Sequence, residues 1–203
     1  MPSPAERVAA AMEAVPRTGF LPPAQRAHTD RDAPLSIGHG QTNSQPTTVR
    51  QMLELLDVQP GDRVLDVGSG SAWTTALLAH LTGPDGSVTG VERVPDLVAF
   101  GAANLVAAGM PWAHVERAVP GTLGWPCGGP YQRILVSAQA PALPAELVDQ
   151  LSAGGVLVLP VAGRMLRVRA DDGGPTVEEH GWYRFVPLVA DPPAGRAAPG
   201  PAG

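Results

Sequence analysis

The sequence predicts an α/β fold in which helices cover a doubly wound parallel sheet. Two observations predict it. Apolar segments at 63–67, 87–92, 131–137 and 156–161 alternate with segments of helical periodicity, which favours right-handed βαβ units. The first apolar segment also runs directly into a glycine-rich turn that a helix follows. That arrangement is typical of Rossmann-like folds.

Residues 1–60 precede this alternation, and we interpret them as an N-terminal segment of helices and loop. A short helix is expected at 6–14, where Pro16 stops it. The stretch 15–43 is rich in Pro, Gly, His, Asp and Arg and has no clean period. A loop of that length is commonly functional when it is ordered. A second helix is expected at 44–57, with the Ser44 hydroxyl as its N-cap.

Residues 61–189 form the predicted α/β domain. A further strand is expected at 114–118, and helices at 71–81, 96–108 and 145–151. Three segments then follow one another without helices between them, which predicts an antiparallel edge at 165–169, 176–179 and 183–188. The stretch 190–203 is mostly Pro, Ala and Gly, and we expect a disordered tail there.

Composition narrows the class of protein. The chain has 203 residues and a net charge of −5, and all 14 of its basic residues are Arg. This balance argues against binding to nucleic acid or to a membrane surface. Cys127 is the only cysteine, and the histidines have no ligand spacing, so we expect neither a disulfide nor a metal site. The start of the chain lacks the pattern of a secretion signal, so we expect a cytoplasmic protein, and a monomer.

The glycine-rich turn predicts a nucleotide-like cofactor and makes 61–189 a cofactor-binding domain. Gly68, Ser69 and Gly70 lie between the strand and the helix, where the backbone can approach a ligand closely. Trp73 occupies the third small-residue position of a dinucleotide fingerprint, which argues against NAD. Asp66 adds an acid at the strand end that would favour a cationic ligand. S-adenosylmethionine, which carries an ammonium and a sulfonium, fits these features.

The next two loops supply the rest of the expected cofactor site. Glu92 closes the second strand, where an acid can accept hydrogen bonds from both ribose hydroxyls. After the third strand the chain reads Val119-Pro120-Gly121. Val119 and Pro120 could pack on an adenine ring and Gly121 would complete the turn, but neither apolar side chain can accept a hydrogen bond from the exocyclic amine.

A series of short motifs extends from Val15 to about Leu188. The most specific is Gly38-His39-Gly40-Gln41-Thr42-Asn43-Ser44-Gln45-Pro46, and the others are Val15-Pro16-Arg17, the segments 60–71 and 130–134, Gly124-Trp125-Pro126, Gln150-Leu151 with Gly154-Gly155, and Arg184-Phe185-Val186-Pro187-Leu188. In this order they resemble the protein-L-isoaspartate O-methyltransferase family, whose signature is Gly-x-Gly-Gln-Thr-Ile-Ser-Gln-Pro. The resemblance implies a Rossmann-like methyltransferase sheet.

The resemblance also implies an activity. Members transfer a methyl group from S-adenosylmethionine to the free α-carboxylate of an isoaspartyl residue in a protein or peptide, and the ester then cyclises to a succinimide, which begins repair. By position, Ser44 would hydrogen-bond the substrate carboxylate, and Thr42, Asn43 and Gln45 would lie beside the substrate. A carboxylate is already ionised at neutral pH, so a hydroxyl and backbone donors suffice without a general base.

The chain also departs from the family pattern. Asn43 replaces Ile, Ala72-Trp73 replaces Gly-Tyr, Val119-Pro120 replaces Gly-Asp, and Gln132 replaces Asp. The polar Asn43 and the changed loop leave open a carboxyl methyltransferase dedicated to one peptide. The two lost acids leave open a cofactor-binding relative without catalysis.

Overall fold

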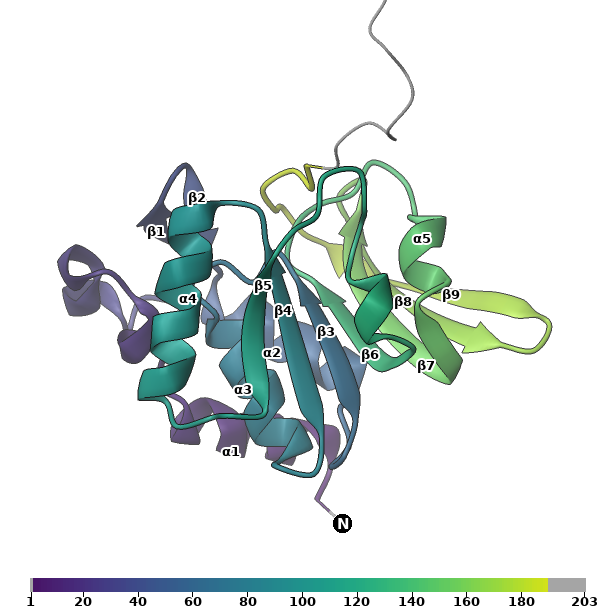
Figure 1. Cartoon of the computed structure of the whole chain (residues 1–203), viewed down its shortest axis with the longest axis horizontal. Coiled ribbons are helices and arrows are strands. Elements are labelled where there is room, and N and C mark those ends of the chain that lie inside the picture. The colour runs from purple at the N-terminus through teal and green to yellow at the C-terminus, as the bar shows by residue number, and fades with distance from the viewer. Residues whose placement is uncertain (1, 190–203) are drawn as a thin grey trace, which may run out of the picture.

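The computed structural model describes residues 2–189, so the predicted tail at 190–203 lies outside the described residues. Its centre is a seven-stranded sheet of order β5-β4-β3-β6-β7-β8-β9 (Figure 1). The strands are β3 (Arg63–Val67), β4 (Ser87–Glu92), β5 (Ala113–Arg117), β6 (Tyr131–Val136), β7 (Leu151–Val161), β8 (Arg164–Asp171) and β9 (Gly174–Trp182). The first five pair in parallel, and β7, β8 and β9 pair antiparallel. The predicted α/β sheet with its antiparallel edge is confirmed.

Helices cover both faces of the sheet, because alternate strand residues point to opposite sides. Val64 belongs to the apolar cluster shared with α1 (Pro4–Ala14), α2 (Pro46–Leu56), α3 (Trp73–Thr82) and α4 (Pro95–Ala107). Leu65, one residue later, belongs to the cluster on the opposite face, which includes Leu147 of α5 (Ala145–Val148). Figure 1 shows this division, with α5 apart from the other helices. The N-terminal helices thus share one core with the sheet.

The starts of the first two helices differ from each other. At α1, the Ser3 side chain accepts a hydrogen bond from the Glu6 backbone and the Glu6 side chain accepts one from Ser3, which is a capping box. The expected Ser44 cap of α2 is wrong. The N-cap of α2 is Gln45, with Pro46 in the first turn and no side-chain cap bond. Pro46 lacks the backbone N–H that would need a cap.

The aperiodic stretch 15–43 contains regular structure that its composition concealed. Two 3₁₀ helices, Arg17–Phe20 and Pro23–His28, lead into an antiparallel hairpin of β1 (Leu35–Gly38) and β2 (Gln41–Asn43). The hairpin lies on the carboxyl-end side of the sheet, beside the upper end of α4 (Figure 1). Its strands are too short to show an alternating pattern, which explains why it was not predicted.

The last described segment corrects a second expectation. Residues 183–188 do not form an edge strand, since β9 ends at Trp182. Instead the Gln139 backbone donates to Val186 O at 2.8 Å, and the Leu188 backbone donates to Gln139 O at 2.7 Å. Pro187 lacks the N–H of a regular strand. The chain therefore returns to the carboxyl-end edge of the parallel strands.

Between residues 2 and 189, no helix combines the length and the apolar character needed to cross a bilayer.

Candidate functional site

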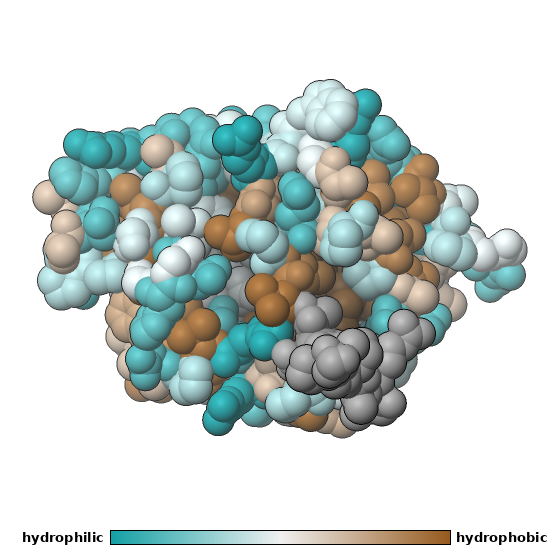
Figure 2. Space-filling model, turned by 90° about the horizontal axis from the view of Figure 1, so that it is seen from above, coloured by the Kyte–Doolittle hydropathy of each residue, from teal (hydrophilic) through white to brown (hydrophobic). Residues whose placement is uncertain are grey.

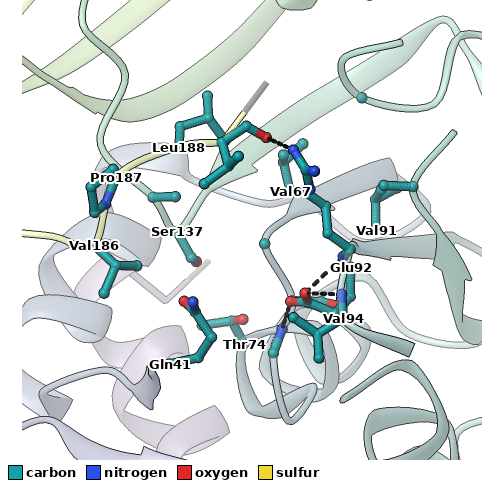
Figure 3. Close-up of a pocket in the computed structure, with 18 of the residues that line it drawn as sticks. Gln41, Val67, Thr74, Val91, Glu92, Val94, Ser137, Val186, Pro187 and Leu188 are labelled. Carbon is teal, nitrogen blue, oxygen red and sulfur yellow. Dashed lines mark hydrogen bonds between the residues drawn. The ribbon is translucent and has the colours of Figure 1, made fainter. Parts of the chain in front are cut away.

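A cavity of about 310 Å³ lies at the carboxyl-end edge of the parallel strands. Its walls come from the loops after β3, β4, β5 and β6, from the β1–β2 hairpin and from residues 186–189. Figure 2 looks down on this edge and shows hydrophobic residues exposed between hydrophilic ones near the middle of the face. In Figure 3, Glu92 and Val94 lie on one side of the open space, and Val186, Pro187 and Leu188 on the other. The volume is within the range of small-molecule sites.

The glycine-rich turn forms the floor of this cavity. Gly68 and Gly70 have φ values of 79° and 54°, which glycine adopts without steric cost. A Cβ on Gly70 would lie 3.0 Å from Ile37 Cδ1, so the turn and the hairpin are in close contact. Gly68, Ser69 and Gly70 all line the cavity, as predicted from their position after β3.

Glu92 is held by the backbone around it. Its side chain is buried, and Oε2 accepts a hydrogen bond from the Gly70 N–H at 3.0 Å. Oε1 accepts from the Arg93 N–H at 2.7 Å and from the Val94 N–H at 2.9 Å (Figure 3). The carboxylate has about four acceptor sites. The two on Oε1 and one on Oε2 are used, so Oε2 can still accept a hydrogen bond from a ligand hydroxyl. The three N–H groups fix the carboxylate at the cavity wall.

Asp66 does not line the cavity, and its predicted direct contact with the cofactor is corrected here. Strand alternation points it toward α3, where Oδ2 accepts hydrogen bonds from Thr74 at 2.8 Å and Thr75 at 2.7 Å. Burial raises the pKa of Asp66 to about 6, against the opposing effect of these two bonds. Among residues 2–189, Asp66 Oδ1 and Ser69 Oγ are buried without a hydrogen-bond partner.

Trp73 lines the cavity but does not fill it. Its indole Nε1 donates to Val15 O at 3.0 Å, and the Arg17 guanidinium lies 5.6 Å from the centre of the ring. The ring is 3% exposed. This anchoring holds Trp73 in the wall, against the N-terminal segment.

The end of β2 brings the predicted substrate residues to the opposite wall. Thr42, Asn43 and Ser44 line the cavity. The Asn43 side chain is already engaged, because Oδ1 accepts from Arg17 Nε at 2.6 Å and Nδ2 donates to Ser71 Oγ at 3.0 Å. Within the described part of the chain, the Ser44 hydroxyl makes no hydrogen bond, and only its backbone oxygen is used, by Arg17. Ser44 is thus free to serve a ligand.

The structure also corrects the predicted contact of Gln45 with the substrate and that of Pro120 with the cofactor. Gln45 points away from the cavity, and its Nε2 donates to Asp32 Oδ2 at 3.0 Å. Pro120 is exposed and outside the lining, because the Thr122 N–H donates to Val119 O at 3.1 Å and closes a tight turn. Pro120 stands at the tip of that turn. Val119 and Gly121 do line the cavity.

Several cavity residues were missed by the sequence reasoning. They include Gln41, Ser137, Glu146, Val186, Pro187, Leu188 and Val189. Val186, Pro187 and Leu188 belong to the segment expected to be an edge strand, and Val189 follows it. Arg93 Nη1 holds this end of the segment by donating to Val189 O at 2.6 Å. The proline in that segment was the available signal against a strand.

Within residues 2–189, no group of three His, Cys, Asp or Glu side chains is placed to hold a metal ion. The cavity combines the fixed carboxylate of Glu92, the glycine turn at 68–70 and the Ser44 hydroxyl, which has no hydrogen-bond partner among the described residues.

Comparison with known proteins identifies the family. The family model described as protein-L-isoaspartate(D-aspartate) O-methyltransferase matches residues 3–192. This chain belongs to that family. It is 43% identical over 190 residues to the protein-L-isoaspartate O-methyltransferase of Methanopyrus kandleri, covering 91% of this chain and 84% of the relative. It is 46% identical over 195 residues to that of Anaeromyxobacter dehalogenans, covering 93% and 91%.

A solved structure of a family member agrees with the fold. A Plasmodium falciparum structure assigned to the protein-L-isoaspartate O-methyltransferases matches with a TM-score of 0.81 and 26% identity, covering 92% of this chain and 91% of the other. That protein was crystallised with S-adenosyl-L-homocysteine. The family's fold therefore extends over nearly the whole described chain.

Proposed function

We propose that this chain is an S-adenosylmethionine-dependent methyltransferase that esterifies the free α-carboxylate of isoaspartyl residues in proteins or peptides. Family membership supports the activity. The observation that carries the assignment to this cavity is the pairing of a fixed Glu92 carboxylate on one wall with the free Ser44 hydroxyl on another.

The residues present suit an adenosyl cofactor. The positive φ values of Gly68 and Gly70 open the backbone to a ligand, and Glu92 Oε2 can accept a hydrogen bond from a ribose hydroxyl. Ser69 Oγ is a buried hydroxyl without a partner among the described residues, and such a group usually finds one. Val94 and Val119 give the cavity apolar surface for a base.

The proposed reaction depends on how the substrate carboxylate is positioned and needs no proton transfer from it. When bound, S-adenosylmethionine supplies a methyl group on a sulfonium, so that a carboxylate oxygen forms the new C–O bond as the C–S bond breaks and a neutral thioether leaves. Ser44 would donate its hydroxyl hydrogen to the second carboxylate oxygen and orient the first. Alignment of two reactants can lower a barrier by about 7–11 kcal/mol at best.

Calorimetry and turnover together test the proposal. We expect S-adenosylhomocysteine to bind, and an isoaspartyl peptide to be methylated while its aspartyl isomer is not. Binding without turnover on any isoaspartyl peptide would favour a non-catalytic cofactor-binding protein. Turnover restricted to a single peptide sequence would favour a dedicated tailoring enzyme. Absence of cofactor binding would contradict both enzyme assignments.

A further inference from the structure

The adenine ring of the proposed cofactor needs an acceptor for the hydrogen bonds of its exocyclic amine. Its exocyclic amine donates hydrogen bonds, and a buried donor without an acceptor costs free energy. The loop after β5 is where Val119 lines the cavity, but Val119 has no acceptor in its side chain and Pro120 is outside the lining. Another group must accept from the amine if the base lies against this loop.

Helix α5 begins beside that loop. Gln150 Nε2 donates to Leu123 O at 2.8 Å and to Glu146 O at 2.7 Å, so one amide nitrogen joins the loop to the helix. Gln150 Oε1 accepts from the Trp125 N–H at 2.8 Å. A Cβ on Gly124 would lie 2.6 Å from Gln150 Oε1, so the two segments are packed closely and Glu146 is held next to the loop.

The charged side chains that line the cavity differ in whether they can accept a hydrogen bond from a ligand. Among the described residues there are three: Glu92, Arg93 and Glu146. Glu92 is fixed by three backbone N–H groups at the end of β4, and a guanidinium can only donate. The Glu146 carboxylate makes no hydrogen bond or ion pair within residues 2–189 and is exposed. Of the two carboxylates in the lining, Glu146 is therefore the one whose oxygens accept no hydrogen bond from the described residues.

We propose that Glu146, from the start of α5, accepts the hydrogen bond of the adenine exocyclic amine and makes the cavity specific for an adenosyl cofactor. The inference rests on the proposed function, because it needs that cofactor to bind. An amine donating to a carboxylate makes a charge-assisted bond, which is stronger than one to the nearby Thr122 hydroxyl or to a backbone carbonyl. The site would then use two acids on opposite edges of the nucleoside, one for the ribose and one for the base.

A pair of matched ligands tests this assignment. The probes are S-adenosylhomocysteine and its 6-deamino analogue, in which a hydrogen replaces the amine, and calorimetry gives both dissociation constants. The wild-type chain should bind the adenosyl ligand about tenfold more tightly than the analogue. Glu146→Ala should lose most of that preference by weakening only the adenosyl ligand, while Glu146→Gln keeps an acceptor and part of the preference. Asp149→Asn is the control, since Asp149 is exposed on the same segment outside the lining, and it should behave as wild type.

The outcomes separate this inference from the proposed function. If Glu146→Ala keeps the wild-type preference, or weakens both ligands equally, Glu146 does not read the amine, even though cofactor binding and methylation persist. If the wild-type chain binds the two ligands equally, no residue reads the amine and the inference is overturned as well. If the wild-type chain binds neither ligand and methylates no isoaspartyl peptide, the proposed function itself fails.

Discussion

Arg17 Nε donates a hydrogen bond to Asn43 Oδ1 across 2.6 Å, and both side chains are about 95% buried. The same guanidinium donates to the backbone oxygens of Arg31, Ala33, Asn43 and Ser44. Burial lowers the pKa of Arg17 to about 10, which leaves it protonated at neutral pH. One cation therefore fixes the segment that carries Ser44, and Asn43 is part of that arrangement.

Restoring the family residue at position 43 should destabilise this chain. Asn43→Ile would leave Arg17 Nε and Ser71 Oγ without their partner in a buried place, and we expect a loss of about 1–3 kcal/mol in the free energy of unfolding. Urea denaturation measures it. Ser71→Ala removes only the bond to Asn43 Nδ2 and should cost less. A variant at least as stable as wild type would mean that the Arg17–Asn43 bond contributes nothing.

Removing the Ser44 hydroxyl should affect turnover and leave cofactor binding unchanged. Ser44→Ala deletes one donor to the substrate carboxylate, and we expect kcat/KM to fall by about 10- to 100-fold. Ser36→Ala, in the hairpin that precedes Ser44 but outside the cavity, is the matched control and should keep full activity. Equal turnover in Ser44→Ala and wild type would remove Ser44 from the proposed mechanism.

Neutralising Glu92 should weaken the cofactor. Glu92→Gln keeps the shape of the side chain but replaces the charge-assisted hydrogen bond to the ribose with a neutral one, so the dissociation constant of S-adenosylhomocysteine should rise by about tenfold. Calorimetry measures the constant. Glu116→Gln, a half-buried acid on the neighbouring strand β5 and outside the lining, provides the comparison. An unchanged constant in Glu92→Gln would contradict the ribose assignment.

Asp66 should make stability depend on pH. Its pKa is raised by burial to about 6 from the ordinary value of 3.8, so the folded state binds the proton more tightly than the unfolded state. The unfolded carboxyl ionises near pH 4 while the folded one still holds its proton, so the free energy of unfolding falls from about pH 4 to pH 6 and is level above pH 6, where both states are ionised. Asp66→Asn should therefore gain stability relative to wild type as pH rises from 4 to 6, and keep that gain at higher pH. A difference between the two chains that stays constant over this range would refute the shift.

The sequence was most informative where patterns are long and least where the chain is irregular. The run from β3 through the glycine turn to α3 follows from alternation and glycine, and Glu92 follows from its place at the end of β4. The hairpin ending at Asn43 has strands too short for a periodic signal. The engagement of Asn43 with Arg17 joins segments 26 residues apart, which no local pattern reveals. Glu146 reaches the cavity only because α5 packs on the loop after β5.

The Asp66 and Pro120 corrections share a physical reason. Their positions in the sequence place both residues next to the turns of the cofactor site. The direction in which each side chain points, however, depends on the local backbone geometry. Strand alternation turns Asp66 toward Thr74 and Thr75, and the turn from Val119 to Thr122 puts Pro120 on the outside. Position along the chain predicted the loops of the site correctly and the side chains within them less well.

The most direct measurement of the central claim is methyl transfer to a pair of peptides that differ only in one aspartyl linkage. Labelled S-adenosylmethionine is incubated with the full chain and each peptide, and base-labile methyl ester is counted. We predict ester on the isoaspartyl peptide and none above background on its aspartyl isomer, with Ser44→Ala reducing the signal. Equal labelling of both peptides, or labelling of neither while the cofactor binds, would contradict the account.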